Sequence, residues 1–222
     1  MSVSARLDAK LAKALGGQWS RLSHRAGWPE DHAELVGRDL IARLAEPQRA
    51  YHNGHHILAL LGHAHSAGGL VQDPVAMSLA IWFHDIVYDP QRSDNEALSA
   101  ELALSQVEPL TGSKIMAQKV QSMVLATAQH QPAEDADDDL RLFLDFDLSI
   151  LGSPLDVYTP YAEAIRQEYS FVPEDRYVAG RQAVLHNFLN RERLYFTNYG
   201  ASLWERQARA NLRAELRELA KP

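Results

Sequence analysis

Histidine and aspartate side chains gather in two short stretches of this chain, and both residue types bind metal ions. The first stretch, residues 51–56, reads YHNGHH, and the second is the adjacent pair His84-Asp85. Histidine is the commonest side-chain metal ligand, and a carboxylate adds a hard oxygen to its nitrogen. Since His52 and His56 are four residues apart, a helix would bring them to one face. The pattern indicates a mixed nitrogen and oxygen metal site.

The pair His84-Asp85 stands at the end of an apolar run, residues 80–83 with the sequence AIWF. Such a run is expected to be buried, and burying ionisable groups without a partner is costly. A bound metal ion would compensate this cost.

The elements that must position these residues are predicted to be helices. Apolar residues recur at steps of three and four, and no sustained polar and apolar alternation predicts a strand. Prolines are expected between the helices, where they are tolerated. These are Pro29, Pro47, Pro74, Pro90, Pro109, Pro132, Pro154, Pro160 and Pro173. Asp73 before Pro74 marks one helix start, and the acidic pair after Pro173 marks another.

We therefore predict an all-α protein, a single helical bundle of about nine or ten helices over residues 1–222. The metal-site core would span about residues 51–151, and C-terminal helices over residues 156–220 would pack on it. Residues 203–219 are expected to form an amphipathic surface helix. The acidic run at residues 134–139, EDADDD, is expected to be a solvated loop.

Composition limits the function further. The chain has 222 residues, 46% of them hydrophobic, and a formal net charge of -7. An acidic surface argues against extended binding to nucleic acid or to an anionic membrane. The absence of cysteine excludes disulfides, cysteine metal sites and a cysteine nucleophile. With no apolar signal core and no apolar stretch long enough to span a bilayer, we expect a cytoplasmic protein. The oligomeric state is left open.

Three pieces of the chain resemble the HD superfamily of metal-dependent phosphohydrolases. Residues 51–56 have the form Y-H-N-x-x-H found in its cyclic-nucleotide phosphodiesterase branch, and His84-Asp85 matches the doublet that names the superfamily. Asp147, in the segment FDLSIL, looks like the late motif that carries the final aspartate. The pieces occur in the family's order. The sequence around the doublet, residues 82–90 and 94–96, is similar to that of small bacterial HD proteins.

The resemblance implies an HD-type fold and a divalent metal held by His56, His84, Asp85 and Asp147. The metal would be Mn, Fe, Co, Ni, Zn or Mg, since all fit such ligands. A water activated by the metal would attack phosphorus in a small phosphorylated substrate, most plausibly a nucleotide. His52 would donate a proton to the leaving oxygen, and Asp85 would also steady the attacking water.

One departure from the family pattern leaves the number of metal ions open. Phosphodiesterases that hold two metals usually have a further histidine four residues from these motifs, and here Tyr88 occupies that position. His130 is a candidate for a second metal or for the pocket wall, and the alternative is an ordinary histidine at a helix end. Asp145 could replace Asp147 as a ligand, but it would face another side of a helix.

Phosphate chemistry usually recruits cations. The candidates here are Arg49, Lys119, Arg166 and Arg181. The alternative for each is a solvated helix face with ion pairs. His55, His63 and His65 are expected at the surface or in packing. Asn95 and Glu96 would either orient the metal ligands through hydrogen bonds or form the first turn of a helix.

Three other functions remain open from the sequence. A di-iron oxygenase shares this helical scaffold, but it would need additional ligands. A metal-bound or nucleotide-bound sensor without turnover would keep the same ligand set. A purely structural helical protein would leave the clustered histidines and aspartates unexplained.

Overall fold

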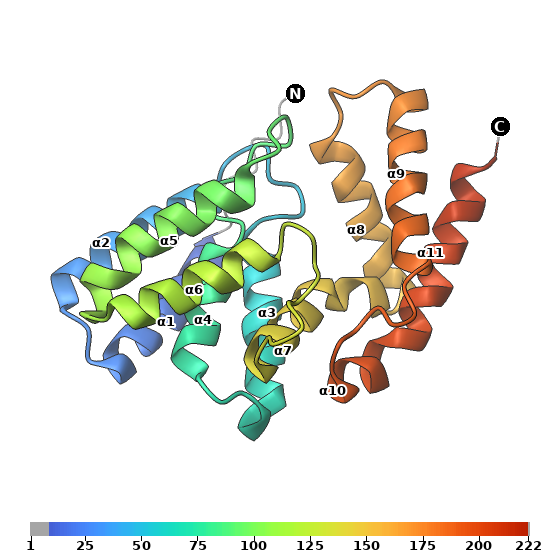
Figure 1. Ribbon diagram of the computed structural model, residues 1–222. Coiled ribbons are helices and arrows are strands. Elements are labelled where there is room, and N and C mark those ends of the chain that lie inside the picture. The colour runs from blue at the N-terminus through green and yellow to red at the C-terminus, as the bar shows by residue number, and fades with distance from the viewer. Residues whose placement is uncertain (1–8, 222) are drawn as a thin grey trace. The chain divides into compact units, whose positions relative to one another are not determined.

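Helices form the secondary structure of residues 9–221, the part of the chain that this computed structural model describes (Figure 1). Apart from the three-residue segment α10, these residues hold ten α-helices, and they contain no strand. The predicted all-α class is therefore confirmed. Within the same residues, none of the helices combines the length and the apolar character that crossing a membrane requires.

The chain divides into two compact units, the first ending at Phe143 and the second beginning at Leu144. The expectation of one domain, with the C-terminal helices packed on the metal-site core, stays a prediction. The first unit contains six complete helices and a short 3₁₀ turn: α1 (Ala9–Ala26), α2 (Glu30–Arg43), α3 (Gly54–Ala67), η1 (Gly68–Leu70), α4 (Pro74–Phe83), α5 (Asn95–Thr111) and α6 (Lys114–Ala126).

Helix α4 is the centre of the first unit. It begins as the sequence predicts, because the Asp73 carboxylate accepts a hydrogen bond from the Ala76 N–H at 3.0 Å and Pro74 is its first residue. Its apolar side chains, from Ala76 to Phe83, are almost completely buried. The helix is therefore held by apolar burial on all sides, and its C-terminal end is fixed in the interior.

Helices α1 and α2 meet at a close contact. The Trp19 indole N–H donates to the Ala33 carbonyl at 2.7 Å, and a Cβ added to Gly37 would overlap the same indole ring. The glycine at this position lets the two helices approach each other around a large aromatic side chain.

The prediction that prolines separate the helices is wrong at two of the nine positions. Pro109 lies in the last turn of α5, two residues before the helix ends at Thr111 and the chain turns at Gly112 with φ 66°. Pro160 lies inside α8 (Leu155–Glu168). Proline has no N–H, so Pro160 cannot donate the helical hydrogen bond to the carbonyl of Asp156, four residues earlier. Both residues are exposed, so water can bind that carbonyl and limit the cost of the missing hydrogen bond.

The acidic run also differs from its prediction, because it is not a solvated loop throughout. Helix α7 (Asp138–Asp147) begins inside the run. The carboxylate of Asp139 is 2% exposed and accepts hydrogen bonds from the N–H groups of Gln72 and Asp73, both at 2.8 Å. Asp139 therefore ties the start of α7 to the turn before α4.

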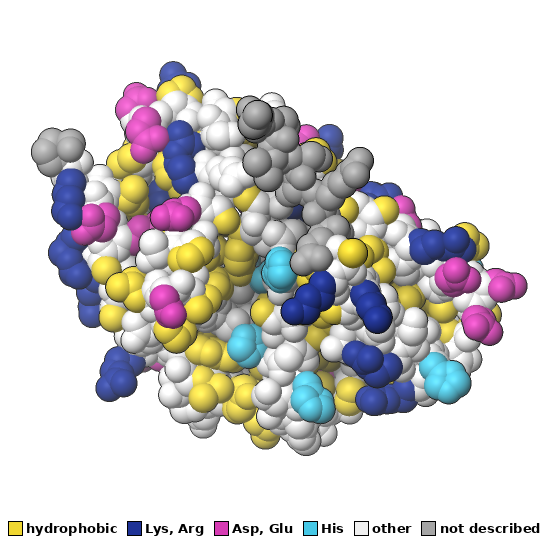
Figure 2. Space-filling model, turned by 180° about the vertical axis from the view of Figure 1, so that it is seen from behind, with side chains coloured by type: hydrophobic (Ala, Val, Ile, Leu, Met, Phe, Trp, Pro, Cys, Tyr) yellow, Lys and Arg dark blue, Asp and Glu magenta, His cyan; other side chains and the backbone are white. Residues whose placement is uncertain are grey.

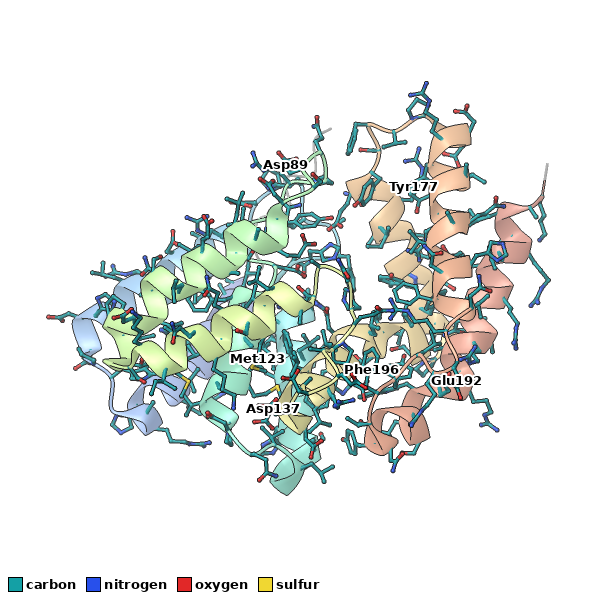
Figure 3. All side chains as sticks on the ribbon, viewed as in Figure 1. Asp89, Met123, Asp137, Tyr177, Glu192 and Phe196 are labelled. Atoms are coloured by element: carbon teal, nitrogen blue, oxygen red, sulfur yellow. The ribbon has the colours of Figure 1, made fainter. Side chains whose placement is uncertain are left out.

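The second unit contains the 3₁₀ segment η2 (Leu148–Gly152), α8, α9 (Glu174–Leu189), α10 (Asn198–Gly200), the π-helical segment η3 (Ala201–Glu205) and α11 (Arg206–Leu219). Helix α9 begins after Pro173, as predicted, and α11 begins three residues later than the predicted surface helix. Helices α8 and α9 meet where the Arg166 guanidinium lies 4.5 Å from the centroid of the Tyr177 ring (Figure 3).

Candidate metal centre

The start of α3 positions the first histidine motif. The Asn53 side chain caps this helix by accepting a hydrogen bond from the His55 N–H at 2.9 Å. The cap places His56 in the first turn, where it is 5% exposed, whereas His55 is on the exposed side. His52 precedes the cap and is half-buried. His55 is thus a surface residue, as the sequence predicts.

The end of α4 positions the second motif. His84 follows the last helical residue, and its backbone N–H donates to the Ala80 carbonyl at 3.0 Å. Its ring is fully buried, and its Nδ1 atom lies 2.9 Å from the Ile81 carbonyl oxygen. The apolar run predicted to be buried therefore carries His84 into the interior.

The two motifs meet at the imidazole Nε2 atoms. The Nε2 atoms of His56 and His84 are 3.1 Å apart. An Asp85 carboxylate oxygen lies 3.0 Å from Nε2 of His84 and 3.9 Å from Nε2 of His56. The Asp85 side chain is 19% exposed, so solvent can reach its carboxylate beside the two buried histidines.

Helix α7 supplies the fourth member of the group. The Phe143 ring of this helix packs edge-on against the His84 ring, with 5.8 Å between centroids, and Asp147 follows one turn later on the same face. One ligand atom from each of His56, His84, Asp85 and Asp147 lies within 4.8 Å of the others. Among the described residues this is the one group of three or more such ligands.

The hydrogen bonds of these rings fit a bound cation. A carbonyl oxygen can only accept, so Nδ1 of His84 carries a proton and Nε2 of the neutral ring presents a lone pair. The Nδ1 atom of His56 lies 3.0 Å from the Tyr51 hydroxyl, which can accept its proton. Two nitrogen lone pairs and two carboxylates would then face one another, and a divalent cation between them would satisfy all four.

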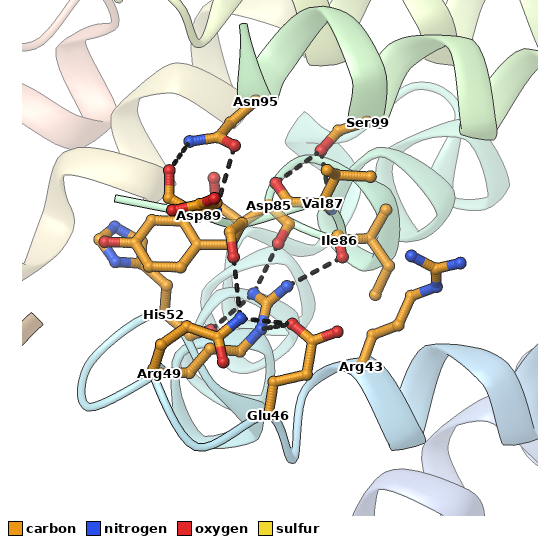
Figure 4. Close-up of polar contacts among 12 residues, drawn as sticks. Arg43, Glu46, Arg49, His52, Asp85, Ile86, Val87, Asp89, Asn95 and Ser99 are labelled. Atoms are coloured by element: carbon orange, nitrogen blue, oxygen red, sulfur yellow. Dashed lines mark hydrogen bonds and ion pairs between the residues drawn. The ribbon is translucent and has the colours of Figure 1, made fainter. Parts of the chain in front are cut away.

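Arg49 fastens the two ligand-bearing segments together (Figure 4). Its guanidinium, fully buried, donates to the His52 carbonyl at 2.9 Å and to the Asp85 and Ile86 carbonyls at 2.7 and 2.8 Å. Its Nε lies 3.2 Å from a Glu46 carboxylate oxygen. Phosphate binding by Arg49 stays a prediction. Its role between the two segments could not be predicted from the sequence, because the partners are backbone carbonyls.

His52 stands beside the metal-ligand group without belonging to it. Its ring centroid is 6.2 Å from that of His56, and it stacks on Tyr88 at 4.4 Å with 29° between the ring planes. The Tyr51 ring contacts it edge-on at 5.0 Å. Tyr88, the residue that departs from the family pattern, therefore restrains the plane of the His52 ring.

The loop after the His84-Asp85 doublet is closed by side chains from the start of α5 (Figure 4). The Asn95 amide donates to the Asp89 carbonyl at 2.8 Å and accepts from the Asp89 N–H at 3.1 Å. The Ser99 hydroxyl, which the sequence analysis did not single out, accepts from the Val87 N–H at 3.0 Å. These bonds fix the backbone that carries Asp85.

The other cationic candidates lie among carboxylates or carbonyls. The Lys119 ammonium has carboxylate oxygens of Asp73, Asp139 and Asp137 at 3.5, 3.6 and 3.8 Å. Phosphate binding by Lys119 stays a prediction.

The two candidates of the second unit are similarly engaged. Arg166 donates to Glu174 at 3.0 Å and to the Tyr169 carbonyl at 2.8 Å. Arg181 makes two bonds to Glu215, at 2.7 and 3.1 Å. A role for either residue in phosphate binding stays a prediction.

Three further histidine and aspartate residues are not part of the group. His130 has a positive φ of 45°, uncommon for a residue with a side chain, and does not join the four ligands. Asp145 is fully buried and accepts hydrogen bonds from the N–H groups of Phe196 and Thr197. Burial, with a smaller contribution from the charge of His56, lowers the pKa of His63.

Comparison of the chain with protein-family models, with curated proteins and with solved structures found no match.

Proposed function

We propose that this protein is a divalent-metal-dependent phosphohydrolase of the HD type, which cleaves a phosphate ester in a nucleotide. The observation that carries the proposal is the convergence of His56, His84, Asp85 and Asp147, whose ligand atoms lie within 4.8 Å of one another. Their order along the chain is that of the HD motifs.

The ligand set suits a hydrolytic metal. When bound, a divalent ion supplies Lewis acidity toward a phosphoryl oxygen and lowers the pKa of a coordinated water. Asp85 is partly exposed, so its carboxylate can also accept a hydrogen bond from an attacking water. Arg49 holds the backbone of both motifs, so the ligands are already in place before substrate arrives.

His52 is the general acid of the proposal. An imidazole titrates near neutral pH, so it can give a proton to the leaving oxygen. Its stack on Tyr88 and its edge contact with Tyr51 restrict rotation of the ring, while its half-buried position leaves it within reach of solvent and substrate. This restriction supports a proton donor with one fixed direction.

The test is a hydrolysis panel with matched variants. The chelator-treated wild type, Asp85→Ala and His55→Gln are each supplied with Mn²⁺, Fe²⁺, Co²⁺, Ni²⁺, Zn²⁺ or Mg²⁺. Each is then assayed on p-nitrophenyl phosphate esters and on linear and cyclic nucleotides. We expect turnover by the wild type and by His55→Gln, which changes an exposed neighbour of the ligands. Asp85→Ala is expected to lose activity by at least about a hundredfold while remaining folded by circular dichroism.

Other outcomes would redirect the proposal. Metal-loaded wild type without turnover on any of these substrates would contradict phosphohydrolysis on this panel. Iron-dependent absorbance with oxygen consumption would favour a di-iron oxygenase. Saturable nucleotide binding without product would favour a sensor.

A further inference from the structure

A groove of about 700 Å³ lies in the first unit, formed by α1, α3 and α4. Each helix lines it with residues spaced three or four apart, such as Gln18, Arg21 and Arg25 on α1. None of the four metal-ligand candidates lines it. The groove is therefore a separate feature, of the size that small-molecule sites usually have.

The floor of the groove is apolar. Met77 and Trp82 of α4 are almost completely buried, whereas Leu58 and Leu61 of α3 are half-buried and keep part of their surface open. A ligand that covers these side chains would remove apolar surface from water, which favours a hydrocarbon or aromatic body.

The rim of the groove is cationic. Arg21 and Arg25 are exposed and stand one turn apart on α1, and His65 of α3 is also exposed. Neither arginine has an ion-pair partner within the part of the chain described, and no acidic residue of that part lines the groove. In a chain of net charge -7, this rim is a local reversal of charge that complements an anion.

Basic and histidine side chains lie beside hydrophobic ones on the face of the molecule that Figure 2 shows. The combination of an apolar floor and a cationic rim fits a molecule that is apolar at one end and anionic at the other.

The indole N–H of Trp82 adds an independent observation. It is buried and has no hydrogen-bond partner, and His32 Nε2 is the one other such side-chain atom in residues 9–221. The neighbouring Trp19, at 5.4 Å between ring centroids, has its N–H satisfied by the Ala33 carbonyl. Leaving a buried donor without an acceptor is costly, so Trp82 is a lining residue of the groove whose N–H is not compensated within the described part of the chain.

We propose that this groove binds a free, small amphipathic anion, with its carboxylate or phosphate head at Arg21 and Arg25. Its apolar body lies over Leu61, Met77 and Trp82. A volume of about 700 Å³ suits a drug-sized molecule, whereas a stable protein partner would need a much larger contact surface. The proposal does not depend on the metal centre or on hydrolysis.

The test uses dodecanoate as the probe and the metal-free full chain as the receptor. Isothermal titration calorimetry measures binding below the critical micelle concentration, and tryptophan fluorescence reports on the floor of the groove. The variants are the double substitution Arg21→Gln with Arg25→Gln, the floor substitution Leu61→Glu, and the control Arg38→Gln. Arg38 is an exposed arginine of α2 outside the groove.

We expect saturable binding of dodecanoate by the wild type and by Arg38→Gln. The double arginine variant should bind about five- to tenfold more weakly, since exposed ion pairs contribute modestly. Leu61→Glu should abolish detectable binding with no loss of helicity by circular dichroism.

Three results would overturn the proposal. One is the absence of saturable binding in the wild type. A second is equal binding of uncharged dodecanol, which would remove the role of the rim. The third is binding of inorganic phosphate as tight as that of dodecanoate, which would remove the role of the floor.

Discussion

The Nδ1 atom of His56 lies 3.0 Å from the hydroxyl oxygen of Tyr51, five residues earlier in the chain. This bond turns the opposite nitrogen, Nε2, toward His84 and Asp85. Hydrogen bonds to the far nitrogen of a ligating histidine fix its tautomer and orientation. Tyr51 is therefore a positioning residue for the proposed metal.

We predict that Tyr51→Phe lowers the affinity for Mn²⁺ or Zn²⁺ by about ten- to a hundredfold, because the ring of His56 loses its anchor. Competition with a chromophoric chelator measures this affinity, and thermal unfolding of the metal-free protein should change little. Tyr177→Phe, in the second unit, provides a matched control. Unchanged metal affinity in Tyr51→Phe would contradict the role of the hydroxyl.

Arg49 is predicted to contribute strongly to stability. Arg49→Met leaves the carbonyls of His52, Asp85 and Ile86, which are partly or fully buried, without their donor, at about 1 kcal/mol each. We expect the free energy of unfolding in urea to fall by about 3 kcal/mol. Arg43→Met removes a surface ion pair with Asp39 and should cost less than about 1 kcal/mol. Equal losses of stability in the two variants would contradict the stabilising role of the hydrogen bonds from Arg49 to the backbone carbonyls.

Local signals were enough to predict the helices. Three- and four-residue periodicity predicts the all-α class, and the Asp73-Pro74 pair predicts the start of α4, because caps and amphipathic stripes depend on neighbouring residues. The prediction that prolines separate helices is wrong at Pro109, which lies in the last turn of α5, and at Pro160, where the helix is exposed and water limits the cost.

Long-range polar contacts could not be predicted in the same way. The carbonyls that Arg49 binds at Asp85 and Ile86 are 36 and 37 residues away along the chain. The N–H groups that Asp139 caps are 66 and 67 residues away. Nearly every residue has the same backbone groups, so the sequence does not indicate which of them binds a side chain. An arginine or aspartate with such a partner is therefore predicted to be an ordinary surface charge. Residue types and spacing alone indicate a metal site at residues 51–56 and 84–85, whereas Asp147 enters the predicted ligand set only through the resemblance to the HD superfamily.

Asp145 and Asp147 are predicted to have opposite roles, although they are two residues apart on α7. Asp145→Asn places an amide among the N–H groups of Phe196 and Thr197, and we expect a stability loss of about 1–3 kcal/mol. Asp147→Asn should leave the stability of the metal-free protein nearly unchanged and reduce metal affinity. Urea unfolding and metal titration of both variants measure this difference. The reverse pattern would show that Asp145 is the ligand.

His63 is predicted to make stability depend on pH. Burial lowers the pKa of His63 below the ordinary value of 6.5, so the folded state holds this ring neutral. As the pH falls below 6.5, the unfolded chain binds a proton first, and stability is lost until the lowered folded pKa is reached. Urea unfolding between pH 8 and pH 5 should therefore show a smaller loss of stability for His63→Gln than for the wild type. An equal loss in the two proteins would contradict this coupling.

The metal centre is best tested by comparing metal binding by the wild type and by His84→Ala. Chelator-treated protein is titrated with Zn²⁺ and with Mn²⁺ by isothermal calorimetry, with circular dichroism to verify that the variant is folded. We predict saturable binding by the wild type and a loss of at least about a hundredfold in affinity for folded His84→Ala. Binding of equal affinity by the two proteins, or no binding by the wild type, would contradict a metal centre at His56, His84, Asp85 and Asp147.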